Sequence, residues 1–197
     1  MSKEGVDIGR RRFLTLTTSV VGGVGAAAWA WPFLAQLKPS ERAKAMGAPI
    51  TIDISKLEPG QQITVAWRSQ AVFVVKRTQE MLDSLKEVVP HLADAGSDAP
   101  QQPDYAKNET RSIKPEILVM KGVCTHLGCS PKFRPDRGAA DIGADWQGGF
   151  YCPCHGSKFD LAGRVFKGVP APTNIVVPPH KYVNDTTLII GEDQGAA

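Results

Sequence analysis

Two short boxes of cysteine and histidine hold the residues of this chain that are best suited to chemistry. The first box, residues 124–129, reads CTHLGC, and the second box, residues 152–157, reads CPCHGS. Together they contain all four cysteines and two of the four histidines. A Cys-x-His pair in the first box and a Cys-x-x-His pair in the second supply two thiolates and two imidazoles, which bind iron or zinc. The boxes therefore predict a metal centre held between two loops.

Two cysteines remain after these four ligands are assigned, and they bear on which metal is bound. Cys129 closes the first box, and Cys154 stands inside the second. A structural zinc ion fits the spacing but leaves both of them unused. A two-iron cluster with cysteines on one iron and histidines on the other uses the same four ligands, and the surplus pair could then form a disulfide in an oxidising compartment. We therefore favour a [2Fe-2S] cluster, and a membrane-anchored structural zinc module that organises partners is the alternative.

The N-terminal part of the chain is typical of an exported membrane anchor. Residues 13–37 carry no charge, and as a helix they would extend about 37 Å, which exceeds the roughly 30 Å hydrocarbon core of a bilayer. Arg10 and Arg11 in front of this run look like a twin-arginine export signal, and that route carries proteins already folded around a cofactor. The Ala-Trp-Ala sequence at residues 28–30 offers a cleavage site. Because the run is longer than a signal peptide needs, we expect an uncleaved anchor.

The rest of the chain is patterned as a mainly β head. Short runs of β-branched and apolar residues alternate with turn-forming residues. Apolar residues at helical spacing predict one helix over residues 78–90 that packs on the sheet, and residues 93–111 are polar and loop-like. The expected strands are 50–54, 63–67, 71–75, 117–120, 175–177 and 187–190.

These patterns divide the chain into parts. The net charge of +3 is too small to indicate a nucleic-acid partner. Two further histidines, His91 and His180, have no metal-binding box around them, and we expect them to be surface or packing residues. We expect Trp67 and Trp146 to be core or loop anchors. The expected parts are a cytoplasmic N-terminus with the signal (1–12), a transmembrane anchor (13–37), a flexible neck (38–49) and a head (50–197) whose cluster-binding subdomain spans about 121–172.

The two boxes resemble those of the Rieske iron–sulfur proteins, and the added Cys129 and Cys154 make them similar to the iron–sulfur subunits of ubiquinol–cytochrome c reductase, the cytochrome bc complex. Residues 168–172, GVPAP, look like that family's proline-rich loop over the cluster, and the long connection at 130–149 resembles proteobacterial members. The resemblance implies a mainly β protein. A transmembrane helix would precede a Rieske-type antiparallel β-sandwich head with a small inserted cluster-binding subdomain and one helix–loop insertion.

The resemblance also implies a role for each site residue. The cysteine that opens each box would bind the buried iron, and the histidine would bind the outer iron with its other ring nitrogen near the surface. These ligands are Cys124, Cys152, His126 and His155. The other two cysteines, Cys129 and Cys154, would form a disulfide between the loops.

Three further positions carry implied roles. The Ser157 hydroxyl would donate a hydrogen bond to a cluster sulfur, and Leu127 would lie at the docking tip. In high-potential members of the family a tyrosine, two residues after this serine, donates to the first ligand cysteine, but Phe159 stands here. Because a donor to sulfur stabilises the more negative reduced cluster, its absence predicts a lower reduction potential. The residues of the implied cluster cover are Gly168, Pro170 and Pro172.

The implied function is that of the electron-transfer subunit of a respiratory quinol–cytochrome c reductase. His155 would contact quinol in a neighbouring cytochrome b subunit and accept its proton while the cluster accepts one electron. The head would then swing on its neck and pass the electron to a c-type cytochrome subunit. This electron transfer would contribute to proton translocation. We expect a single-pass protein of a bacterial inner membrane, with a periplasmic head, in a dimeric complex. A nearer alternative is the small Rieske subunit of a periplasmic oxidoreductase such as arsenite oxidase.

Overall fold

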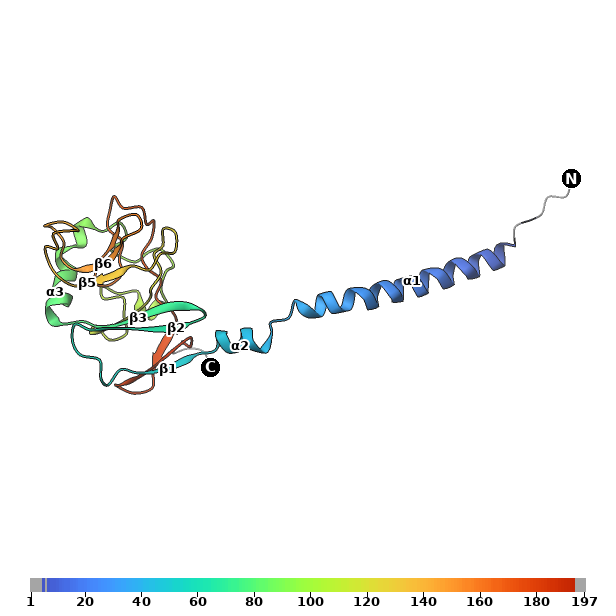
Figure 1. Cartoon of the computed structure of the whole chain (residues 1–197), viewed down its shortest axis with the longest axis horizontal. Coiled ribbons are helices and arrows are strands. Elements are labelled where there is room, and N and C mark those ends of the chain that lie inside the picture. The colour runs from blue at the N-terminus through green and yellow to red at the C-terminus, as the bar shows by residue number, and fades with distance from the viewer. Residues whose placement is uncertain (1–4, 6, 194–197) are drawn as a thin grey trace. The chain divides into compact units, whose positions relative to one another are not determined.

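The computed structural model describes residues 5 and 7–193, which fall into two units that divide between Ala45 and Met46 (Figure 1). The first unit contains helix α1, Ile8–Gln36, which runs on through Pro32. Asp7 starts this helix because its side chain accepts the backbone N–H of Arg10 at 3.1 Å. The helix therefore includes both arginines of the export signal, and by length and composition it is able to cross a membrane.

A second short helix, α2, Glu41–Gly47, occupies much of the expected neck. The Ser40 hydroxyl accepts the backbone N–H of Ala43 at 3.2 Å and so caps its first turn. The end of the neck is tied to the head, because the Trp67 ring Nε1 donates to the Ala48 carbonyl at 3.2 Å. The segment from Met46 onward belongs to the same unit as the head.

The head consists of three antiparallel sheets of three strands each among the described residues. The base sheet has the order β1-β9-β8, the central sheet β2-β3-β4, and the third sheet, within the expected cluster-binding subdomain, β5-β6-β7. The strands are β1 Ile50–Asp53, β2 Gln62–Trp67, β3 Gln70–Lys76, β4 Ile117–Lys121, β5 Lys132–Arg134, β6 Gly149–Cys152, β7 Ser157–Phe159, β8 His180–Tyr182 and β9 Thr187–Ile190.

Strands β3 and β4 of the central sheet are buried on both faces, which explains why they read as nearly continuous apolar runs. One face packs on the base sheet through residues such as Val74 and Val119. The other face carries Phe73 and Met120 into a second core that also contains both box-opening cysteines. The expected β-sandwich head is confirmed, and the candidate site is built on the second core.

Helix α3, Gln79–Glu87, is the predicted helix in a shorter form, since the chain continues as a 3₁₀ turn, Val89–His91, around Pro90. Thr78 caps α3 by accepting the N–H of Met81 at 3.3 Å. Met81, Leu82 and Leu85 pack against Leu161 and Ala162, so the helix covers the turn that follows β7. A second 3₁₀ turn, Asp104–Ala106, lies in the polar loop.

The strand expected at 175–177 is wrong. The Ile175 N–H donates to Gly163, the Val176 carbonyl accepts from Lys121, and the Val177 N–H donates to Gln101, each at 2.8 Å. The partners of these hydrogen bonds belong to three separate segments, so residues 175–177 form no ladder with a single neighbouring strand. Strand β8 instead begins directly after this segment, at His180. His180, Trp67 and Trp146 are buried as expected, whereas His91 is exposed.

Candidate metal centre

The two boxes form a matched pair of tight turns. The first follows β4, and the second closes the hairpin between β6 and β7, where Cys152 pairs with Ser157. In the first box the Gly128 N–H donates to the Cys124 carbonyl, and in the second the Gly156 N–H donates to the Cys152 carbonyl, both at 3.0 Å. Both glycines have positive φ, +85° and +76°, a conformation that favours glycine. Each box therefore turns its chain back immediately after the first cysteine.

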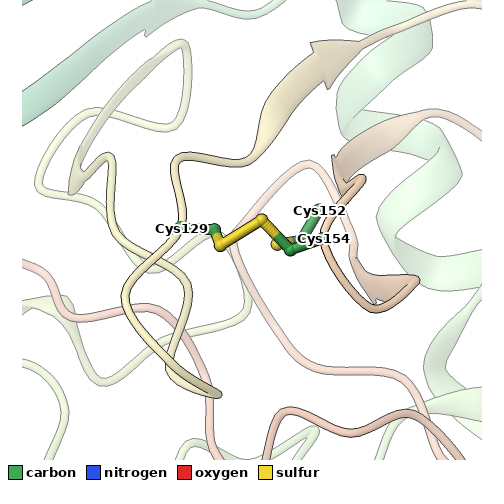
Figure 2. A group of neighbouring side chains, drawn as sticks. All are labelled: Cys129, Cys152 and Cys154. Atoms are coloured by element: carbon green, nitrogen blue, oxygen red, sulfur yellow. A yellow bond between two sulfur atoms is a disulfide. The ribbon is translucent and has the colours of Figure 1, made fainter.

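A disulfide between Cys129 and Cys154 joins the two turns, as the resemblance implied (Figure 2). Their sulfur atoms and that of Cys152 all lie within 4.8 Å of one another. The two bonded sulfurs are no longer thiols and do not add ligands to the centre. The free cysteines are therefore Cys124 and Cys152, both 2% exposed.

The thiol pair and the imidazole pair lie at different depths. Burial raises the pKa of the Cys152 thiol, and the neighbouring Cys124 thiol raises it further, while the backbone N–H groups of Cys154 and His155 oppose this shift. The rings of His126 and His155 meet edge to face with centroids 4.8 Å apart. His155 is exposed and His126 is half-buried. Two adjacent buried sulfur donors and two adjacent outer nitrogen donors are the donor pairs that a [2Fe-2S] cluster with divided ligation requires.

The predicted cover is tied to both boxes. Ser157 is fully buried, and its hydroxyl oxygen accepts the backbone N–H of Ala171 at 3.1 Å. That hydrogen bond leaves the hydroxyl hydrogen available to a second acceptor, such as a cluster sulfur. Thr125, in the first box, donates to the Thr173 carbonyl at 2.7 Å. The loop containing Gly168, Pro170 and Pro172 therefore ends on contacts to both turns.

The two remaining predicted residues lie at opposite extremes of exposure. Leu127 is 71% exposed at the turn of the first box. Phe159 is fully buried in the core that also contains Cys124 and Cys152. The structure thus brings the predicted site residues of both boxes and the cover together in one part of the head.

Sequence reasoning missed three features near the site. Trp146, expected only to pack, also lines an open groove of about 880 Å³ that ends at His155. The insertion at 130–149 is ordered by Arg134, which donates to Asp136 and Asp141 and whose carbonyl accepts the Trp146 ring N–H. Alternating arginine and aspartate in this insertion was the available signal. A group of buried arginines behind the second box was also missed.

Comparisons with known proteins agree with this geometry. A family model described as the Rieske [2Fe-2S] domain matches residues 50–179, and one described as the ubiquinol–cytochrome c reductase Fe-S subunit TAT signal matches residues 1–40. The chain is 61% identical over 197 residues to the ubiquinol–cytochrome c reductase iron–sulfur subunit of Allochromatium vinosum, covering 100% of this chain and 95% of that protein. It is 43% identical over 190 residues to the same subunit of Blastochloris viridis, covering 96% and 97%. A solved chain of a hyperthermophilic respiratory Complex III has a TM-score of 0.49 at 25% identity, covering 88% of this chain and 98% of that one.

Proposed function

The chain belongs to the Rieske iron–sulfur subunits of ubiquinol–cytochrome c reductase, and from this we propose how its residues take part in quinol oxidation. The cofactor of this family is a [2Fe-2S] cluster, which supplies a centre that takes up and releases one electron. Cys124 and Cys152 would bind it from the core, and His126 and His155 from the surface. The difference in depth between the thiols and the imidazoles is the observation that carries this assignment.

His155 is the residue we assign to quinol. It is exposed, so the ring nitrogen that is not a ligand is accessible to a hydroxyl group of a bound quinol and can accept its proton. Leu127, which follows His126 in the first box, is exposed and would offer an apolar contact to the surface of a cytochrome b subunit. Cys124 and Cys152 are sealed from water, so a partner reaches the centre from the histidine side.

The head would then carry the electron to a c-type cytochrome subunit. Helix α1 supplies a membrane anchor, and the twin-arginine signal supports a cytoplasmic N-terminus with the head on the periplasmic side. The bonds that join both boxes to the proline loop favour motion of the head as a whole over motion within the site. We propose that this motion starts in the neck, within a dimeric complex.

Electron paramagnetic resonance on dithionite-reduced membranes that contain the full-length chain tests this function. We expect a signal with an average g below that of all-cysteine clusters, and a change in that signal when a quinol-site inhibitor is added. His155→Ala should abolish the signal, whereas the matched control His91→Ala, at an exposed histidine outside the boxes, should keep it. Zinc in the purified protein without an iron signal would contradict the cluster, and a signal insensitive to the inhibitor would contradict quinol oxidation.

A further inference from the structure

Two buried arginines bind the backbone of the turn that follows β7, residues 160–164. Arg77 donates to the Leu161 carbonyl at 3.0 Å, and Arg111 donates to the Ala162 and Gly163 carbonyls at 3.1 and 3.3 Å. Three consecutive carbonyls therefore point to two guanidinium groups. Arg77 is 2% exposed, and Arg111 is fully buried.

The two arginines come from distant parts of the chain and are themselves held firmly. Arg77 follows β3 and also donates to the Thr110 carbonyl and the Ser112 hydroxyl, at 2.9 and 2.8 Å. Arg111 has a positive φ of +48°, which is unfavourable for a residue with a side chain. Its guanidinium also donates to the Gln102 side-chain oxygen at 2.9 Å.

The positive charge around this turn exceeds the negative charge. A third buried guanidinium, that of Arg164, donates to the Asp160 carboxylate at 2.7 Å, and both residues are 1% exposed. Asp160 is the single buried carboxylate among the described residues of this group. Asp94 and Glu116 also face the arginines, but they are half-buried and exposed, so solvent screens their charge.

The turn is connected to both cluster-binding boxes. Strand β7 enters it directly from the second box, through Phe159. On the other side, a Cβ placed on Gly163 would lie 3.0 Å from the sulfur of Met120, in the strand that leads to the first box. Met120, Phe159 and the two ligand cysteines belong to one buried core. A shift of the turn would therefore be transmitted to both boxes.

Hydrogen bonding alone does not explain the choice of arginine. Neutral amides can donate to carbonyls, whereas burying a charge without a matching partner costs free energy. Burial lowers the pKa of Arg77 and of Arg111 to about 10, so both remain charged at neutral pH. A site that gains one negative charge when it is reduced is stabilised by uncompensated positive charge nearby.

We propose that Arg77 and Arg111 are positioning residues that hold the 160–164 turn behind both boxes and raise the reduction potential of the metal centre through their charge. Asp160 opposes them and lowers that potential. This proposal rests on the proposed function in one respect, which is that the metal centre takes up an electron. It does not depend on which donor or acceptor is used.

The test is a redox titration of the Rieske signal in membranes that contain the full-length chain. Arg77→Gln and Arg111→Gln should each lower the midpoint potential while the line shape is retained, and the corresponding lysine variants should lie nearer to wild type. Asp160→Asn keeps an oxygen for the N–H groups of Ala162 and Arg164 but loses the charge, so it should raise the potential. Arg137→Gln, at an arginine of the insertion paired with Glu87 on the surface, is the matched control and should leave the potential unchanged.

The opposite signs separate charge from damage to the fold, because disruption would move all three variants in the same direction. Unchanged potentials in the glutamine variants, or a lowered potential in Asp160→Asn, would overturn the proposal. If the glutamine variants fail to fold, Asp160→Asn alone decides. Loss of the cluster from all three variants, with Arg137→Gln intact, would assign these residues a structural role only. The absence of an iron signal in wild type would instead contradict the proposed function.

Discussion

Replacing Phe159 with tyrosine should raise the reduction potential of the cluster. Phe159 is fully buried in the core with Cys124 and Cys152, so a hydroxyl group added to its ring cannot reach water. A buried hydroxyl needs a partner, and the sulfur atoms of this core are the acceptors that the new donor would serve. A donor of this kind stabilises the reduced centre more than the oxidised one, because the reduced centre carries one more negative charge.

The size of the effect follows from the strength of such a hydrogen bond. A neutral hydrogen bond contributes about 1 kcal/mol net, and a charge-assisted one is roughly twice as strong. The reduced state would therefore gain about 1 kcal/mol more than the oxidised state. At about 1.36 kcal/mol, or about 59 mV, per tenfold change for one electron, the expected rise is about 40 mV.

The assay is a redox titration of the cluster signal in membranes with full-length wild-type and Phe159→Tyr chains. Phe133→Tyr is the matched control, since Phe133 packs at the edge of the same core but is only half-buried. The reduction potential of the cluster should not change in this variant. An unpaired hydroxyl would instead destabilise the fold by about 1–3 kcal/mol. A lower thermal midpoint with an unchanged potential would therefore refute the reasoning.

Four other perturbations follow from contacts described above. Ser157→Ala should lower the potential by about 40 mV through loss of one charge-assisted hydrogen bond, and hydrogen exchange should be faster at Ala171, whose N–H loses its acceptor. Cys129→Ser removes a cross-link over a sequence separation of 25 and should cost about 3–4 kcal/mol in denaturant unfolding. Shortening or stiffening residues 43–49 should slow turnover without changing the cluster spectrum. Trp67→Phe, which removes the bond to Ala48, should speed hydrogen exchange at residues 46–48.

Each of these has an outcome that contradicts it. Slow exchange at Ala171 in Ser157→Ala would mean that the serine does not hold the proline loop. Unchanged unfolding of Cys129→Ser would show that the disulfide does not stabilise the head. Unchanged turnover in the neck variants would contradict the mobile-neck proposal. Unchanged hydrogen exchange in Trp67→Phe would show that the bond between Trp67 and Ala48 does not hold the end of the neck.

The parts of the molecule that could be predicted from the sequence are those set by local spacing. Cysteine, histidine and glycine recur in both boxes at short intervals, so the paired turns follow from neighbours in the chain. The anchor follows from a long uncharged run, and the helix after Thr78 from its apolar spacing. These features depend little on where distant segments lie.

The parts that could not be predicted depend on distant partners. Arginine is usually exposed, and nothing around Arg77 or Arg111 shows that each will meet carbonyls from the 160–164 turn. Likewise the apolar residues at 175–177 have the composition of a strand, but their bonds are divided among three segments. An apolar sequence pattern indicates that a residue is buried, but it does not indicate which segment of the backbone that residue will contact.

The arrangement of the two boxes is suited to the proposed coupling of a proton to an electron. In both boxes the first cysteine precedes the turn at the glycine, where the chain returns to the core. The two thiols are therefore buried. The histidines lie further along each turn, nearer the surface, and His155 is open to a partner. In the function we propose, electrons would enter and leave through the imidazole side, which would also be the side that exchanges protons. Because the disulfide and the bonds to the proline loop fix this side, the proposed change of partner would involve movement of the head rather than rearrangement of the site.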